Sequence, residues 1–126
     1  ASFGRTLAPD YFERTRPARV YISEHYRAAI ILTRENGHAY MDKFTVSDDA
    51  QGEGLGRAIW AVMRAENPRL FWRSRRGNAI NEFYFANSDG VAKDERWTVF
   101  WYGLDDWKAI RFAVEHARCR PATLVD

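Results

Sequence analysis

Two short stretches carry residues whose types and spacing could do chemistry. The first, residues 51–57, reads QGEGLGR and places three glycines at alternate positions directly before a helical pattern. The first N–H groups of a helix attract anions, and glycines let a phosphate approach them because no Cβ stands in the way. The second, residues 71–75, reads FWRSR and puts Arg73 and Arg75 on one face of a predicted strand. These cations indicate either a small anionic ligand or a solvated strand face with surface ion pairs.

The spacing of the glycines separates three kinds of phosphate loop. A nucleotide P-loop ends in Gly-Lys-Ser/Thr, whereas Gly56 is followed by Arg and Ala, so no hydroxyl is offered to Mg²⁺. A dinucleotide fingerprint has its third glycine three residues after the second, whereas Gly52, Gly54 and Gly56 are evenly spaced. The remaining pattern, Gln51-x-x-Gly54-x-Gly56, resembles the pyrophosphate loop Q/R-x-x-G-x-G/A of the GNAT family of acetyl-CoA-dependent N-acetyltransferases. The alternative is that the glycines serve a tight turn and close helix packing.

Three predicted strands lead into this loop. Residues 18–22, 27–33 and 38–46 are rich in β-forming residues, and the short connections between them fit an antiparallel meander. Strict alternation divides the side chains of the third strand into two sets, one of Met41, Lys43 and Thr45 and the other of Asp42, Phe44 and Val46.

A βαβ unit is predicted around the loop. The helix after it has one apolar stripe, formed by Leu55, Ile59, Val62 and Met63. The dipeptide at 67–68, Asn-Pro, ends this helix, and residues 70–75 form a strand that a helical crossover makes parallel to the third one. The glycines therefore lie at the first βα turn.

The C-terminal third is predicted to contain a short helix, a strand and a final helix. The short helix covers residues 80–85, a turn follows at 87–90, and the strand covers 96–102. Asp105 is placed to cap the final helix, whose apolar face is formed by Trp107, Ile110, Val114 and Ala117.

Several motifs together resemble a narrower family, the acetyltransferase domain of N-acetylglutamate synthase. The resemblance is to the vertebrate-like type, found also in bacterial bifunctional N-acetylglutamate synthase/kinase, and it covers about residues 20–117. It rests on YMDKF at 40–44, FWRSR, Asn78, Tyr84 and WTVFWYG at 97–103. It implies one α+β GNAT domain over residues 1–126, with a mixed central sheet flanked by helices. It also implies direct transfer of acetyl from acetyl-CoA to the α-amine of L-glutamate, as in arginine biosynthesis.

The resemblance implies roles for individual residues as well. Arg73 and Lys43 would bind the glutamate carboxylates, in a pocket lined by Tyr40, Met41 and Phe44, with Arg75 and Asn78 close by. Tyr84 would transfer a proton, towards the leaving thiolate, and Asn78 would orient or polarise the substrate. The backbone of Thr45 and Val46 would meet the pantetheine arm. The pyrophosphate would be held by Gln51, Gly52, Glu53, Gly54, Leu55, Gly56 and Arg57.

Composition restricts the possible partners. The 126 residues are 46% hydrophobic, which suits one domain with a core, and the net charge of +2 is too small to indicate nucleic acid by itself. No apolar run is long enough to span a bilayer, and Cys119 is the only cysteine, so a zinc cluster built on cysteines is excluded. We expect a cytoplasmic protein that has acetyl-CoA as co-substrate and binds no metal.

The expected context is a longer protein. The first residue is Ala, which suggests a C-terminal piece preceded by an amino-acid kinase domain, and the resembled proteins imply a homo-oligomer. Two other functions fit the cofactor loop: a GNAT acetyltransferase for a different amine, and a non-catalytic domain that binds acetyl-CoA for regulation or assembly.

Overall fold

The computed structural model describes residues 6–7, 19–48, 54–121 and 124–125. The predictions for Gln51, Gly52 and Glu53 therefore lie outside the described residues. A mixed sheet has the strand order β2-β3-β4-β5-β7-β6, and its only parallel pair within the described chain is β4 with β5. Its strands are β2 (Arg19–Ile22), β3 (Ala28–Glu35), β4 (His38–Val46), β5 (Leu70–Arg75), β6 (Gly90–Lys93) and β7 (Trp97–Tyr102).

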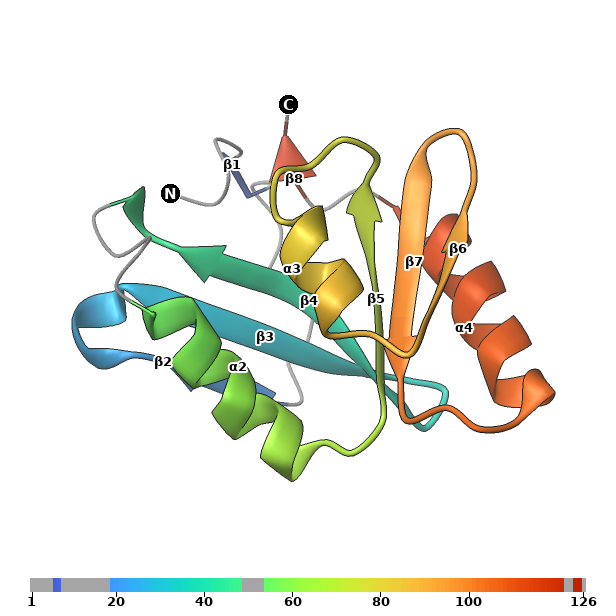
Figure 1. The fold of residues 1–126 in the computed structure, drawn as a ribbon, viewed down its shortest axis with the longest axis horizontal. Coiled ribbons are helices and arrows are strands. Elements are labelled where there is room, and N and C mark those ends of the chain that lie inside the picture. The colour runs from blue at the N-terminus through green and yellow to red at the C-terminus, as the bar shows by residue number, and fades with distance from the viewer. Residues whose placement is uncertain (1–5, 8–18, 49–53, 122–123, 126) are drawn as a thin grey trace.

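Helices cover both faces of this sheet (Figure 1). On one face lie α2 (Leu55–Glu66) and α3 (Asn81–Ala86), and on the other lies α4 (Trp107–Cys119). A 3₁₀ turn, η1 (Glu24–Tyr26), joins β2 to β3, and the short strands β1 (Thr6–Leu7) and β8 (Leu124–Val125) pair antiparallel with each other. No helix in the described part of the chain is long and apolar enough to cross a membrane.

The predicted meander and βαβ unit are confirmed. Strands β2, β3 and β4 pair antiparallel in sequence order. Asn36 and Gly37 both adopt positive φ, at 55° and 84°, as a two-residue hairpin turn requires. The chain then crosses through α2 to β5, which is parallel to β4.

A β-bulge in β4 contradicts the strict alternation predicted for this strand. Ile31 pairs with Lys43 while the next residue of β3, Leu32, pairs with Met41, so Asp42 is the extra residue. The bulge rotates the strand by one position, and Met41 therefore packs in the same core cluster as Phe44 and Val46. The predicted separation of Met41 from Phe44 was wrong because period 2 holds only while each residue has one partner.

The parallel pair is short, and this opens the sheet. Tyr40 and Phe71 form the one register pair between β4 and β5, and beyond it the two strands diverge towards their C-terminal ends (Figure 1). The bulge at Asp42 lies two residues beyond the pair. The point of divergence is thus placed beside the YMDKF and FWRSR motifs.

Two apolar clusters fill the two sides of the sheet. The cluster beneath α2 and α3 is rich in large rings, including Trp60, Trp72, Tyr84, Phe100 and Tyr102. The cluster beneath α4 is smaller, with Tyr40, Phe71, Val99, Leu104, Ala113 and Ala117 as its buried members. These clusters hold the two sides of the site in place.

The buried faces of both α2 and α4 differ in part from the predicted ones. In α2, Trp60 is buried and Val62 is 54% exposed, because the buried face is centred on Met63 between Ile59 and Trp60. In α4, Trp107 is 83% exposed, while the small residues Ala113 and Ala117 are buried in the cluster between the helix and the sheet.

The cap of α4 and one edge strand also differ from prediction. The N-cap is Asp106 rather than Asp105, since the Asp106 carboxylate accepts a hydrogen bond from the Ala109 N–H at 3.0 Å. The edge strand β6 begins at Gly90, inside the segment predicted as a turn.

Candidate functional site

The glycine loop ends in a close contact between α2 and β4. Gly54 is the N-cap of α2 with φ 76°, a left-handed conformation that suits glycine. A Cβ on Gly56 would lie 3.1 Å from Cγ2 of Val46, so glycine lets the helix start directly against the end of β4. The helix-packing alternative therefore holds at Gly56. It is compatible with anion binding, because the first N–H groups of any helix have no carbonyl one turn earlier to bond.

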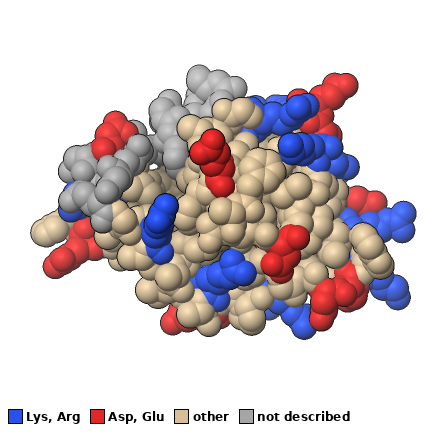
Figure 2. Space-filling view, viewed as in Figure 1, with Lys and Arg blue, Asp and Glu red and all other residues tan. Residues whose placement is uncertain are grey.

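A groove of about 660 Å³ runs between α2 and α3. Arg57, Trp60 and Arg64 line it from α2, and Glu82, Phe83 and Asn87 lie on the other side. Figure 2 views this face and shows charged side chains scattered around a broad central area of uncharged residues. Arg57 lies in the first turn of α2 and also lines the groove, so one ligand could contact both the start of the helix and the groove.

Tyr84 lies on the same side of the sheet, inside the aromatic cluster. Its ring is 5.3 Å from both Trp72 and Phe100 and 6.5 Å from Phe44, between ring centroids. Burial raises the pKa of Tyr84, and the charge that Tyr40 would carry if ionised raises it further. No residue in the described ranges donates to or accepts from its hydroxyl. Tyr84 therefore keeps its proton at neutral pH and is suited to donate it.

Asn78 and Asn81 shape the turn that delivers Tyr84. Asn78 accepts a hydrogen bond from the Ile80 N–H at 3.2 Å through Oδ1, and Asn81 donates to the Arg75 carbonyl at 3.1 Å through Nδ2. The Asn78 bond fixes the turn before α3, and the Asn81 bond ties the start of α3 to the end of β5. Asn78 thus has a structural bond that the sequence did not indicate, and the catalytic role assigned to it remains a prediction.

Arg73 lies on the opposite side, under the C-terminal end of α4. Its Nη1 donates to the carbonyls of Ala117 at 2.8 Å and Arg120 at 2.6 Å, and its Nη2 donates to Pro121 at 2.9 Å. Its guanidinium also stacks 3.8 Å from the centre of the Trp97 ring, which Arg75 approaches at 4.9 Å. Burial lowers the pKa of Arg73, but a guanidinium remains charged. The sequence alternative of a solvated strand face does not hold for Arg73.

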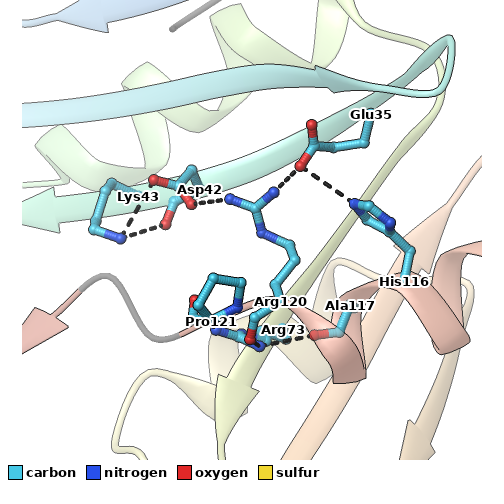
Figure 3. Close-up of polar contacts among 8 residues, drawn as sticks. All are labelled: Glu35, Asp42, Lys43, Arg73, His116, Ala117, Arg120 and Pro121. Carbon is cyan, nitrogen blue, oxygen red and sulfur yellow. Dashed lines mark hydrogen bonds and ion pairs between the residues drawn. The ribbon is translucent and has the colours of Figure 1, made fainter. Parts of the chain in front are cut away.

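Lys43 is held by the bulge residue. Its Nζ is 3.1 Å from the Asp42 carbonyl and 3.4 Å from Asp42 Oδ2. The other carboxylate oxygen of Asp42 accepts from Arg120 Nη2 at 2.8 Å. Figure 3 shows these groups between β4 and the end of α4, with Arg73 below them.

The network continues to β3 and α4. Arg120 forms an ion pair with Glu35 through Nη1, and the same Glu35 oxygen is 3.3 Å from His116 Nε2 (Figure 3). Arg120 also stacks 4.4 Å from the centre of the Tyr40 ring. Burial raises the pKa of Tyr40, and the positive charge of Arg73 partly opposes the rise. Glu35 is 81 positions from His116, and together with Arg120 these residues form no short motif, so sequence reasoning missed them.

The predicted site residues therefore fall on two sides of the point where β4 and β5 diverge. Tyr40, Lys43, Arg73 and Arg75 lie towards α4, whereas Met41, Phe44 and Tyr84 lie towards α2 and α3. Val46 lies against Gly56, and Thr45 pairs with Ala29 in β3. Within the described residues no group of three or more His, Cys, Asp or Glu side chains is placed to hold a metal ion.

This arrangement of sheet and helices is that of the GNAT acetyltransferases. A protein described as a GNAT-family acetyltransferase from Bacteroides thetaiotaomicron superposes with a TM-score of 0.61 at 12% identity, over 85% of this chain and 73% of that one. A protein named as a streptothricin acetyltransferase from Bacillus anthracis, solved with acetyl coenzyme A, superposes with a TM-score of 0.53 at 19% identity, over 69% and 63%. The predicted fold class is confirmed.

Sequence relatives define the family more narrowly. Residues 1–120 match the family described as NAT, N-acetyltransferase, of N-acetylglutamate synthase. An acetylglutamate kinase from Xanthomonas campestris is 57% identical over 130 residues, which cover 99% of this chain and 30% of the relative. The mitochondrial N-acetylglutamate synthase of Mus musculus is 44% identical over 134 residues, covering 98% of this chain and 25% of the relative. The chain belongs to this family of N-acetyltransferase domains and spans less than a third of these relatives.

Proposed function

We propose that the domain transfers the acetyl group of acetyl-CoA to the α-amine of L-glutamate. The observation that carries this proposal is the cation cluster of Lys43, Arg73 and Arg75 on one side of the strand divergence, with the protonated Tyr84 on the other. An acceptor with two carboxylates matches the cations, and a proton donor matches a leaving thiolate. Membership in the N-acetylglutamate synthase family supports the same acceptor.

Arg73 keeps the geometry needed for one carboxylate. A guanidinium has five N–H donors, and the described part of the chain uses three of those on Arg73. The two that remain are on Nε and Nη2, the pair that takes a carboxylate side-on with two parallel bonds. Arg73 can therefore fix the end of α4 and bind substrate at the same time.

The charge of the site suits a dianion. The polar network of Figure 3 contains three cations, Lys43, Arg73 and Arg120, and two carboxylates, Asp42 and Glu35. It has surplus positive charge even before Arg75 is counted. Burial of Lys43 and partial burial of Arg73 strengthen their attraction for a carboxylate, because the local dielectric constant is lower than that of water.

Acetyl-CoA is proposed to enter from the other side. Its pyrophosphate would lie at the glycine loop and at the start of α2, its pantetheine arm along the end of β4 at Thr45 and Val46, and its nucleotide in the groove beside Arg57. The acetyl carbon would then lie where β4 and β5 diverge. A neighbour with this fold was solved with acetyl coenzyme A, which supports binding of the same cofactor here.

The reaction is a direct attack. The glutamate ammonium first loses a proton to solvent, and the neutral nitrogen forms a bond to the thioester carbon. The backbone N–H groups at the end of β4 are suited to stabilise the oxyanion, and as the C–S bond breaks, the sulfur takes the proton of Tyr84. The attached nitrogen loses its second proton to solvent, which leaves a neutral amide, and solvent returns a proton to Tyr84.

The larger context is also proposed. The Xanthomonas relative is named an acetylglutamate kinase and is about three times as long as the matched segment. We infer that this domain works in a cytoplasmic protein that also has an amino-acid kinase domain, that the protein is a homo-oligomer, and that its product serves arginine biosynthesis.

The test is the release of CoA thiol with glutamate, aspartate, glutamine and a simple primary amine offered in parallel. Turnover with glutamate well above the other three supports the proposal. Faster turnover with another amine would keep the fold and overturn the acceptor. Tight acetyl-CoA binding, measured by calorimetry, without turnover of any acceptor would instead favour a regulatory or assembly role.

A further inference from the structure

Arg120 occupies an unusual position for an arginine that follows a helix. It is the C-cap of α4, and its side chain is only 15% exposed. Buried arginines are rare unless their charge is paired. Its guanidinium therefore needs negatively charged partners, which the end of a surface helix does not ordinarily provide.

Two carboxylates from neighbouring strands converge on the Arg120 side chain. Asp42, from the bulge of β4, accepts from Nη2 at 2.8 Å, and Glu35, from the end of β3, pairs with Nη1. The guanidinium plane also stacks 4.4 Å from the centre of the Tyr40 ring. A planar fork that pairs and stacks at once is a geometry that arginine provides and lysine does not.

The main chain of Arg120 reaches the same site from below. Its carbonyl accepts from Arg73 Nη1 at 2.6 Å, and the same Nη1 also donates to the Ala117 carbonyl. Both parts of Arg120 thus contact residues proposed to bind the acceptor: the side chain contacts Tyr40, and the carbonyl contacts Arg73.

Asp42 links Arg120 to Lys43, the third residue proposed to bind the acceptor. The Asp42 side chain is only 3% exposed, and its two oxygens point to different cations, Oδ1 to Arg120 and Oδ2 to Lys43. Without Arg120, the buried Asp42 carboxylate would lose one of its cations, so its negative charge would act more strongly on Lys43 and compete with a substrate carboxylate for it. With Arg120 present, that charge is shared and Asp42 is oriented.

We propose that Arg120 is a positioning residue that assembles the acceptor site, holding Lys43 through Asp42 and stacking on Tyr40 while its carbonyl anchors Arg73. This inference rests on the proposed function, since the acceptor it positions is glutamate. It assigns a role in acceptor binding to a residue that touches none of the proposed reacting atoms.

The test compares Arg120→Gln, Arg120→Lys and Asp42→Asn in the full chain, with Arg111→Gln as the matched control. Arg111 lies on the same helix and makes an exposed ion pair with Glu115 at 3.5 Å. Arg120→Gln should raise the KM for glutamate by roughly tenfold or more, because small misplacements of binding groups have large effects. The KM for acetyl-CoA should stay within about twofold in all variants, and Arg111→Gln should match the wild type.

Two further results distinguish positioning from a merely structural role. Arg120→Lys should restore only part of the glutamate KM, since an ammonium cannot bridge both carboxylates and stack. The double variant Asp42→Asn with Arg120→Gln should be no worse than the poorer single variant, since the side chain acts on Lys43 through Asp42. Thermal unfolding of each variant shows whether it is folded.

Three outcomes would overturn the inference. One is an unchanged glutamate KM in a folded Arg120→Gln variant, and another is an equal rise in the KM for acetyl-CoA. A strictly additive double variant would exclude action through Asp42. The wild-type chain is measured first: if it prefers another acceptor or none, the proposed function itself has failed, which is a different result from a wild type active with glutamate and insensitive to Arg120.

Discussion

The two sides of the sheet are packed with different kinds of residue. Beneath α2 and α3 the side chains are aromatic and closely packed, with Trp72 within 5.3 Å of Trp60 and Tyr84 and 5.5 Å of Phe100, between ring centroids. Beneath α4 the apolar cluster is smaller and is continued by a polar network that links β3, β4 and β5 to the end of the helix.

The difference indicates a division of labour. The aromatic side is apolar and closely packed, which suits the proposed role of Tyr84 as a residue that keeps its proton and faces the thioester. The α4 side holds buried charge, which has a high cost unless each charge is paired, and which attracts a charged acceptor. The sides meet where β4 and β5 diverge, so that acceptor and acetyl group would approach from opposite directions.

The largest effect is expected from loosening the aromatic side. Trp72→Ala removes a fully buried ring from the centre of its cluster and should lower the free energy of unfolding by about 3–5 kcal/mol. Chemical denaturation measures this value. Trp107→Ala is the control, since that ring is exposed and its loss should cost little. Equal losses in the two variants would show that the aromatic cluster is not what holds this side together.

Tyr84→Phe tests the catalytic use of the aromatic side. It should lower kcat by roughly 10²–10⁴-fold, the usual contribution of a positioned proton donor. Stability should hardly change, because no described residue hydrogen-bonds to the hydroxyl. The raised pKa means that Tyr84 keeps its proton above pH 10, so its ionisation should not lower the wild-type rate up to that pH. A normal kcat in the variant would remove Tyr84 from the mechanism.

Arg73→Ala tests the α4 side. Loss of a bidentate bond to a carboxylate should lower kcat/KM for glutamate by about 10²-fold, with acetyl-CoA affinity unchanged. The free energy of unfolding should also fall, because the carbonyls at the end of α4 lose their donor. Arg73→Lys should recover little, because lysine lacks the fork. Weaker acetyl-CoA binding in a folded variant would contradict the division between the two sides.

The smallest effect concerns the start of α4. Asp106→Ala removes the side-chain cap and should lower the free energy of unfolding by about 1 kcal/mol. Asp105→Ala serves as its control and should lie near zero. A reversed order in a denaturation experiment would show that the helix begins one residue earlier than in the structure.

The sequence predicted the parts of the fold that depend on local patterns. The hairpin at Asn36 and Gly37, the βα turn at the glycines and the end of α2 at residues 67–68 all follow from neighbouring residues. Hydrophobic periodicity predicted the position of α2 but not its buried face. Val62 is rotated by about 100° around the helix from the buried Met63. Trp60 is buried instead, because it packs against large rings on β5 and α3.

The polar network could not be predicted because it depends on the bulge and on long-range contacts. The bulge at Asp42 is visible only in the pairing with β3, and it changes which side Met41 faces. Arg120 meets Asp42 and Glu35 across 78 and about 85 positions of sequence, so no short motif contains both ends of the contact. The family resemblance indicated Arg73 and Lys43 as substrate-binding residues, but it did not indicate Arg120 and Asp42, which contact them.

The most direct test is a crystal structure of the domain with CoA and N-acetylglutamate bound together. We expect the product carboxylates on Arg73 and Lys43 beneath α4, the CoA pyrophosphate at the start of α2, and the CoA sulfur within hydrogen-bonding reach of the Tyr84 hydroxyl. Product carboxylates on the α2 and α3 side, or a sulfur far from Tyr84, would contradict the division of labour between the two sides.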